Sequence, residues 1–150
     1  MKKTVLKKLD TLGLIANYNR MRKNLPPKLP ERVFIWDETL REGVQTPAVF
    51  LTYVEKVKLA KMLDEMDVAI INVGFPAISE EEKNSVRRIV NEDFHQAKIA
   101  ASARITKSDI DACLECGIRE ISIFTPFNGL NLKYRLKMTK EYAQEKTVEG

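Results

Sequence analysis

A short stretch near the start of the chain concentrates side chains that could do chemistry. WDETLREGVQTP, at residues 36–47, contains Asp37, Glu38, Arg41 and Glu42, followed by a glycine and a proline. Carboxylates are ligands for hard divalent cations, which prefer oxygen donors. An arginine beside such a cation could stabilise negative charge that develops on a substrate oxygen. The stretch is therefore a candidate active site, with a solvated loop of surface ion pairs as the alternative.

The elements that must position this stretch are short apolar runs that alternate with helices. The runs RVFIW, VAIINVG, AKIAASA and EISIFT predict buried strands that begin near residues 33, 69, 98 and 119. Helices are predicted to begin after Thr52, Ser79 and Thr106, each with an acidic residue three positions on, and after Thr139. This order predicts a parallel sheet with right-handed crossovers. Active sites of such folds gather at the carboxyl ends of strands, where residues 36–47 follow the first one.

Each of the first three helices also carries an apolar stripe at helical spacing, which predicts its buried face. The stripes consist of Val54, Val57, Ala60, Leu63 and Met66 in the first, Val86, Ile89 and Val90 in the second, and Ile110, Cys113 and Leu114 in the third.

The fold class that follows is α/β, either a doubly wound sheet or part of a (β/α)8 barrel. Four units cannot close an eight-stranded barrel, which typically needs about 250 residues. We therefore expect residues 31–150 to form the N-terminal half, about four βα units, of a TIM barrel, as an apparent fragment. A half-barrel exposes two strand edges and part of its apolar interior, so we expect the isolated chain to be a homodimer or poorly soluble.

Residues 1–30 differ from the rest in charge and pattern. They carry eight Lys or Arg against one Asp, whereas residues 31–150 carry 17 Lys or Arg against 20 Asp or Glu. Helical spacing predicts an amphipathic helix up to about residue 24, followed by a proline-rich link. This extension could pack on the body or on a partner subunit, bind a membrane surface or RNA, or be a cleaved transit peptide. The basic charge lies outside the body, which argues against a nucleic-acid-binding face on the folded core.

The composition is that of an ordinary globular protein. Hydrophobic residues make up 44% and charged residues 31% of the 150 positions. No apolar run approaches the roughly 20 residues that span a bilayer, and the N-terminus lacks the pattern of a secretory signal. Two cysteines provide no disulfide framework. We therefore expect a cytoplasmic protein with no membrane partner.

DETLREGVQTP resembles the D-x-T-L-R-[DE]-G-x-Q signature of the metal-dependent acyl-CoA Claisen/aldol (β/α)8 barrels. This superfamily includes the 2-isopropylmalate, homocitrate and citramalate synthases and 3-hydroxy-3-methylglutaryl-CoA lyase. Three later segments are similar to the family's segments in the same order: NVGFPAISEEEKNSVRRI, ASARITKSDIDACLECGI and LKYRLKMTKEY. Together they cover about residues 31–145.

The resemblance implies an acyltransferase that condenses acetyl-CoA with a 2-oxo acid through a metal-stabilised alkoxide. Arg41 would polarise the keto oxygen, Glu42 would ligate Mg, Mn or Zn, and Gln45 would lie beside the metal and the substrate. A glutamate rather than an aspartate at position 42 is more similar to the homocitrate synthases. Arg104 could contact a substrate carboxylate or form a salt bridge at the barrel mouth. Thr125, with Asn128, could donate a hydrogen bond to the substrate.

The sequence also departs from the family pattern. The family's metal site needs an H-x-H pair, and the single histidine, His95, is expected at a surface helix end. Asn72 and Asn131 stand where the family usually has a glutamate and often a histidine. Two alternatives therefore stay open: a lyase of the same fold that runs the retro-aldol reaction, and a non-catalytic barrel fragment that acts as a subunit or interaction module. A reading frame that continues beyond Gly150 with an H-x-H pair would favour an enzyme.

Cys113 and Cys116 form a C-x-x-C pair. Redox or zinc chemistry is possible for such a pair. The pair has no second ligand pair, and Cys113 falls on the apolar stripe of the third helix. We therefore expect both cysteines to pack in the structure.

Overall fold

The computed structural model describes residues 30–149. The amphipathic helix and most of the proline-rich link predicted for residues 1–30 lie outside this range, so the predicted division at residues 30 and 31 stays a prediction. The described residues from Phe34 onward belong to one compact unit.

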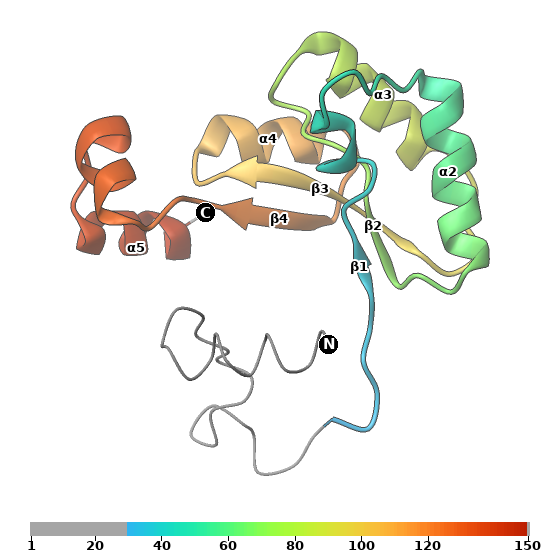
Figure 1. Cartoon of the computed structure of the whole chain (residues 1–150), viewed down its shortest axis with the longest axis horizontal. Helices are drawn as coiled ribbons and strands as arrows, with labels where there is room; N and C mark the ends of the chain where they lie inside the picture. Colours follow the sequence, from blue (N-terminus) through green and yellow to red (C-terminus); the bar gives the residue numbers. More distant parts are fainter. Residues whose placement is uncertain (1–29, 150) are drawn as a thin grey trace, which may run out of the picture. The chain divides into compact units, whose positions relative to one another are not determined.

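Four parallel strands form the sheet of this unit (Figure 1). They are β1 (Trp36–Asp37), β2 (Ile70–Asn72), β3 (Lys98–Arg104) and β4 (Glu120–Phe124). Their spatial order is β1-β2-β3-β4, so each new strand pairs with the one before it. A doubly wound sheet reverses its strand order at a switch point, whereas a barrel adds strands in one direction. The order therefore confirms the predicted α/β fold, an arc of a TIM barrel, for the described residues.

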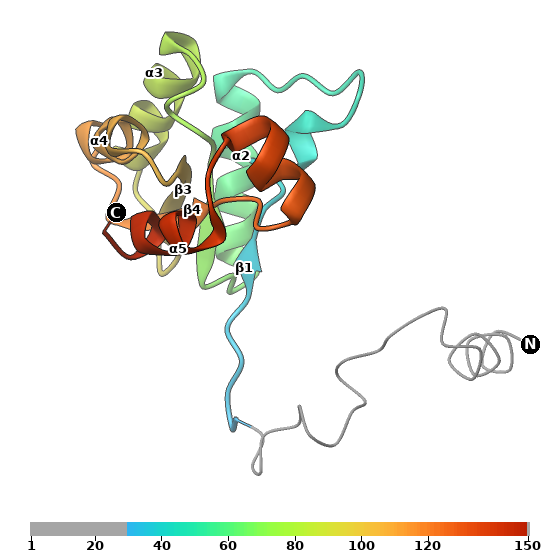
Figure 2. The same ribbon diagram turned by 90° about the vertical axis from the view of Figure 1, so that its left-hand side faces the viewer.

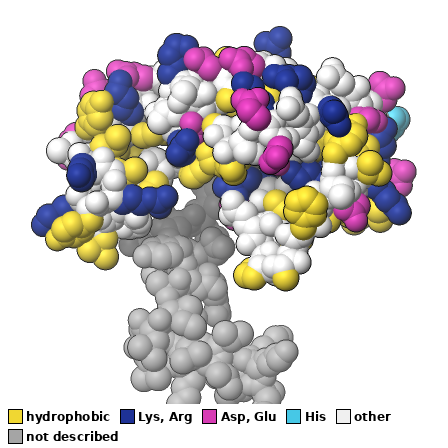
Figure 3. Space-filling view, turned by 90° about the horizontal axis from the view of Figure 1, so that it is seen from above, with side chains coloured by type: hydrophobic (Ala, Val, Ile, Leu, Met, Phe, Trp, Pro, Cys, Tyr) yellow, Lys and Arg dark blue, Asp and Glu magenta, His cyan; other side chains and the backbone are white. Residues whose placement is uncertain are grey.

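Helices α2 (Tyr53–Glu65), α3 (Glu80–Val90) and α4 (Lys107–Glu115) connect successive strands and lie along one side of the sheet (Figure 1). A π-helical segment, Asn131–Leu136, and α5 (Lys140–Glu149) follow β4. Figure 2 looks from beyond the carboxyl end of β4, with α5 in front of the strands. Figure 3 looks onto the helical layer, where cationic and anionic side chains are mixed. Lys83 on α3 and Glu115 on α4 form one ion pair between these helices.

The helix starts follow the predicted capping signals. The Thr52 hydroxyl accepts from the Glu55 N–H, and the Glu55 carboxylate accepts from the Thr52 N–H at 2.8 Å, which completes a capping box. The hydroxyls of Ser79, Thr106 and Thr139 each accept from the N–H three positions on. These bonds satisfy N–H groups that the first helical turn leaves without intrahelical partners.

The main core lies between the helices and one face of the sheet. It is made of fully buried side chains from the strands and helices, including Ile71, Val73, Ala101, Ala103, Val86, Ile89 and Cys113. The opposite face of β2 and β3 carries polar side chains, with Asn72 and Ser102 both buried. Alternation along each strand produces this division, because successive side chains point to opposite faces. The sequence analysis predicted that the half-barrel exposes an apolar interior. On the described strands, the inner face of the sheet instead carries the polar side chains of Asn72 and Ser102.

The prediction of a buried first strand from RVFIW is wrong in extent. Only Trp36–Asp37 form β1, while Val33, Phe34 and Ile35 are 62–77% exposed. β1 pairs with β2 on one side, and β2 itself has only three residues, which limits the length of the ladder. A longer strand would need a partner beyond this short segment.

The predicted apolar stripes are also wrong at some positions. Val54 and Met66 are 70% and 73% exposed, and Leu114 is half exposed. On α2 the fully buried side chains are Ala60, which the stripe predicted, and the charged Lys56 and Asp64, which it did not. The two charged residues are tolerated in the core because each has specific partners.

Asp64 fixes the loop that precedes β3. Its carboxylate accepts three backbone N–H bonds, from His95 at 2.6 Å, Gln96 at 3.0 Å and Ala97 at 2.8 Å. Burial by itself would raise the pKa of Asp64, but these three donors outweigh burial and hold the pKa below its usual value. The ionised carboxylate therefore stabilises the entry of the chain into β3.

We predict that Asp64→Asn lowers the free energy of unfolding by about 2 kcal/mol at pH 7, because an amide nitrogen replaces an acceptor of a charge-assisted bond. The lowered pKa means that the wild-type stabilisation is complete above the unfolded pKa of about 3.9 and is lost as the pH falls through the folded value. The deficit should therefore shrink below about pH 4. Urea unfolding at neutral and acid pH measures it, with Asp93→Asn as the control at an exposed carboxylate. An equal deficit at both pH values would contradict the carboxylate's role.

Candidate active site at the carboxyl edge of the sheet

The turn after β1 directs Arg41 across the end of the sheet. The Asp37 carboxylate accepts from the Thr39 N–H at 2.9 Å and from the Thr39 hydroxyl at 3.0 Å. The Glu38 carbonyl accepts from the N–H groups of Arg41 and Glu42. A 3-10 turn, Gly43–Gln45, then leads the chain away. The charged residues between Asp37 and Glu42 thus form a folded turn at the carboxyl edge of the sheet, where the sequence predicted them.

Arg41 is the most enclosed ionisable group of this turn, with 8% of its surface exposed. Its guanidinium carbon lies 5.6 Å from the centre of the Phe75 ring and 5.7 Å from that of Phe124. The two rings meet edge to face, with centres 5.6 Å apart. Ring faces attract a cation without using its N–H groups. The rings therefore hold the guanidinium while leaving donors available.

The Arg41 nitrogens confirm that these donors are available. Nη1 lies 2.9 Å from Oε1 of Glu42, which makes an ion pair. Neither Nε nor Nη1 makes a hydrogen bond of acceptable direction, although both atoms are buried. The two charges attract each other, but the N–H bonds of Nε and Nη1 point away from the Glu42 carboxylate. An arrangement of this kind suits an oxygen atom of a bound ligand.

Glu42 lies at the rim of this group, with 62% of its side chain exposed. Across residues 30–149, no three His, Cys, Asp or Glu side chains are grouped so as to hold a metal ion. The described residues therefore supply at most one ligand and do not form a complete metal site by themselves. The assignment of Glu42 as a ligand stays a prediction.

Arg104 forms a salt bridge, which is one of the two roles that the sequence analysis gave it; the other was contact with a substrate carboxylate. Its Nε and Nη2 donate to the Asp109 carboxylate at 2.6 and 2.9 Å, and its backbone N–H donates to the same group. The bond from Arg104 holds the pKa of buried Asp109 below its usual value, and it raises the pKa of Arg104. The guanidinium also lies 5.6 Å from the Phe75 ring centre. Phe75 is therefore shared by Arg41 and Arg104.

The remaining predicted residues divide into two groups. Gln45 is exposed at the end of the 3-10 turn and lines the same cavity as Arg41. Thr125 follows Phe124 and is half-buried, but it does not line that cavity. The Asn128 side chain accepts from the N–H of Asn131, the first residue of the π-helical segment, at 2.9 Å. Contacts of Gln45, Arg104 and Thr125 with a substrate stay predictions.

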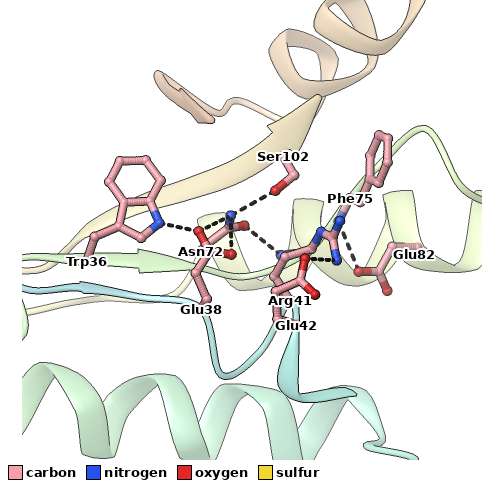
Figure 4. A network of polar contacts seen from close by, with 9 residues as sticks. Trp36, Glu38, Arg41, Glu42, Asn72, Phe75, Glu82 and Ser102 are labelled. Atoms are coloured by element: carbon pink, nitrogen blue, oxygen red, sulfur yellow. Dashed lines mark hydrogen bonds and ion pairs between the residues drawn. The ribbon is translucent and has the colours of Figure 1, made fainter. Parts of the chain in front are cut away.

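A polar network on the inner face joins three strands beside Arg41 (Figure 4). The Asn72 amide nitrogen lies 3.0 and 3.1 Å from the two Glu38 carboxylate oxygens and donates to the Ser102 hydroxyl at 2.9 Å. The Trp36 indole N–H donates to the same carboxylate. The role of Asn72 as a bridge was not predicted, and its only signal was a polar residue inside an apolar run.

The cavity beside Arg41 has a volume of about 620 Å³. It lies between the 3-10 turn and the N-terminal ends of α2 and α3, and Phe75 forms part of its wall. Cavities of this size hold small metabolites. The arrangement can thus bind an anion or a polarised oxygen through Arg41.

His95 and the cysteines do not join this site. His95 is exposed in the loop before β3, at the amino end of that strand, rather than at a helix end. Cys113 and Cys116 are buried and free, and their thiols donate to the carbonyls of Ser102 and Lys83. Burial raises the pKa of Cys113 to about 11, so its thiol is not a nucleophile at neutral pH. Packing is therefore the role that the structure supports.

We predict that Asn72→Asp lowers the free energy of unfolding by about 3 kcal/mol at pH 7, because a buried carboxylate would meet the half-buried carboxylate of Glu38 where an amide now donates. The deficit should shrink as the pH falls towards 4, since protonation of either group relieves the repulsion. Chemical unfolding measures the effect.

The double variant Asn72→Asp/Glu38→Gln is the matched control for this prediction. It restores a donor opposite the new carboxylate and should recover about half of the loss. No recovery would show that the two side chains are not coupled.

Comparison with known proteins places this chain in a family. A family profile described as HMGL-like matches residues 32–150. A "Probable 2-isopropylmalate synthase" of Methanopyrus kandleri is 43% identical over 122 residues, which is 81% of this chain and 24% of that protein. Homocitrate synthase AksA of Methanothermobacter thermautotrophicus is 44% identical over 116 residues, 77% of this chain and 29% of that protein. The 2-isopropylmalate synthase of Sulfurisphaera tokodaii is 40% identical over 120 residues, which is 80% of this chain and 31% of that protein.

The chain spans about a quarter to a third of the length of these relatives. Among the described residues, no helix is long and apolar enough to cross a membrane. The profile match covers all four strands and the turn that carries Arg41. On this evidence, the chain belongs to the HMGL-like family.

Proposed function

We propose that the intact gene product is an acyltransferase that condenses acetyl-CoA with a 2-oxo acid. The observation that supports it most is Arg41, buried at the carboxyl edge of the sheet with Nε free of any hydrogen bond. The relatives named above are synthases of this kind, which supports the same reaction class here. A cytoplasmic location and a homodimer belong to the same proposal.

In this proposal Arg41 stabilises the charge that develops on the former keto oxygen. Its guanidinium is removed from bulk water, so its attraction for that charge is stronger than at an exposed site. The Phe75 and Phe124 rings fix its position before the substrate arrives, which avoids reorganisation during the reaction. Gln45, on the same cavity wall, would orient the substrate.

Glu42 would bind a divalent metal together with ligands from outside the described residues. A bound metal would supply Lewis-acid polarisation of the 2-oxo acid. The exposed carboxylate of Glu42 is accessible to such an ion, and its contact with Arg41 at 2.9 Å places the two groups side by side.

We predict that the intact gene product releases free CoA thiol only when acetyl-CoA and a 2-oxo acid are both present. Arg41→Lys should lower turnover by about 10²–10³, because a lysine keeps the charge but loses the guanidinium donors. Arg119→Lys, at an exposed position before β4, is the control. Thiol release from an acyl-CoA without an oxo acid would instead indicate a lyase, and the absence of any release would indicate a non-catalytic module.

We further predict that Glu42→Ala weakens Mn²⁺ binding to the intact gene product by at least about tenfold, because it removes a carboxylate ligand. Isothermal titration measures the affinity. Glu65→Ala, at an exposed carboxylate on α2, should leave it unchanged. Equal affinities of wild type and Glu42→Ala would remove the metal-binding role.

A further inference from the structure

Glu82 connects a buried ion pair to the backbone beside the candidate site. It lies in the first turn of α3, and its Oε2 lies 2.7 Å from Nζ of Lys56 on α2. The two side chains are 21% and 7% exposed. Burying two charges is costly, and an apolar pair of similar size often stabilises a fold at least as well. Stability alone therefore gives no reason for an ion pair between α2 and α3.

The second oxygen of the Glu82 carboxylate holds the chain where it leaves β2. Oε1 accepts from the backbone N–H of Phe75 at 3.3 Å (Figure 4). This approach requires a glycine at position 74, because a Cβ there would collide with Oε1. Gly74 also has a φ of +154°, a conformation that other residues rarely adopt. The backbone at Gly74 and Phe75 is thus shaped to receive the carboxylate.

The ring of Phe75 depends on this backbone bond for its position. Its centre lies 5.6 Å from the guanidinium carbon of Arg41 and 5.6 Å from that of Arg104. A ring face attracts a cation, but the attraction has no donor and acceptor that would fix the ring in one place. The place of the Arg41 guanidinium therefore depends on how the backbone of Phe75 is held.

Glu82 does not act on a ligand directly. It lines the cavity beside Arg41, but its two oxygens already accept from Lys56 and from Phe75. A carboxylate suits this double task, because it offers two acceptor oxygens, whereas an amide offers one oxygen and one donor nitrogen. Glu82 therefore reaches the site through Phe75.

We propose that Glu82 is a positioning residue, which holds the backbone of Phe75 and thereby sets the place of the Arg41 guanidinium. Lys56 neutralises Glu82 and keeps its carboxylate in the interior. The packing of α2 against α3 is in this way connected to the candidate catalytic arginine. The inference rests on the proposed function for the part that Arg41 plays in turnover, but not for the position of Arg41 itself.

Labelling of arginines with phenylglyoxal tests the position of Arg41 in the 150-residue chain without an assay of activity. Arg41 is buried in the wild type, so we expect its guanidinium to react slowly. Glu82→Gln should raise the labelling rate of Arg41 by at least about threefold, because local opening exposes the group. Peptide mass spectrometry measures this rate relative to the exposed Arg119. An unchanged relative rate would overturn the proposal.

Glu115→Gln is the matched control for this labelling experiment. Glu115 forms an ion pair with Lys83 that also joins two helices, α3 and α4, but neither residue lines the cavity beside Arg41. This variant should leave the labelling of Arg41 unchanged. An equal rise in Glu115→Gln and Glu82→Gln would show a general loosening of the helices and would likewise overturn the proposal.

The double variant Glu82→Gln/Lys56→Met separates the role of the Phe75 bond from a loss of folding. In Glu82→Gln, one amide oxygen faces two donors, and Lys56 is left as an unpaired buried charge. Methionine removes that charge and one of the two donors, so the glutamine oxygen can accept from the Phe75 N–H. The labelling rate of Arg41 should return to within about twofold of the wild-type rate. A rate that stays at the level of the single variant would refute the role of the Phe75 bond.

Thiol release by the intact gene product tests the consequence for turnover. Glu82→Gln should lower kcat by about 10- to 100-fold and leave KM for the 2-oxo acid within about twofold, because misalignment of Arg41 weakens an interaction made in the transition state. A purely structural role would instead lower the melting temperature without changing the turnover per folded molecule. Circular dichroism measures the folded fraction, and an unchanged kcat per folded molecule would contradict the inference.

The outcomes separate this inference from the proposed function. No thiol release by the wild type would refute the acyltransferase, and the labelling of Arg41 would still decide the positioning role. Thiol release with no effect of Glu82→Gln on labelling or on turnover would refute the positioning role alone.

Discussion

The guanidinium of Arg41, enclosed by the rings of Phe75 and Phe124, is the contact on which the arrangement of the site depends. Phe75 follows β2 and Phe124 ends β4, while Arg41 follows β1. Within the sheet, β1 and β4 are separated by β2 and β3. The contacts of 5.6 and 5.7 Å to the two ring centres come from side chains that reach across the carboxyl end of the sheet. This contact joins the turn after β1 to the ends of β2 and β4, and it holds the candidate catalytic arginine in position.

The burial of this cation also explains the chemistry proposed for it. Removal of a charge from water is costly unless partners replace the water. Here the partners are ring faces and one exposed carboxylate, Glu42, so the N–H groups keep their capacity to donate. Arg104 is the contrasting case, because Asp109 takes two of its donors in a bidentate bond. The two arginines share the Phe75 ring, yet only Arg41 has buried donors free for a ligand.

The sheet separates an apolar outer face from a polar inner face. The outer face packs against α2, α3 and α4, whereas the inner face carries the network of Glu38, Asn72 and Ser102. Gly74 allows the chain to pass from β2 into the site, because a Cβ at this position would lie 2.0 Å from Oε1 of Glu82. The glycine, and with it the close approach of Glu82, thus fixes one wall of the cavity.

The sequence by itself determined the features that depend on near neighbours in the chain. The capping residues, the alternation of strands and helices and the turn before Arg41 arise from contacts over a few positions, and a local pattern predicts such contacts. Patterning failed where distant partners decide burial: Lys56 is buried because Glu82 neutralises it, and Val54 is exposed. Only the tertiary structure decided the enclosure of Arg41, the bond from Arg104 to Asp109 and the contact of Phe75 with both arginines. The physical reason is that strand pairing and helix packing bring together side chains whose separation in sequence carries no periodic signal.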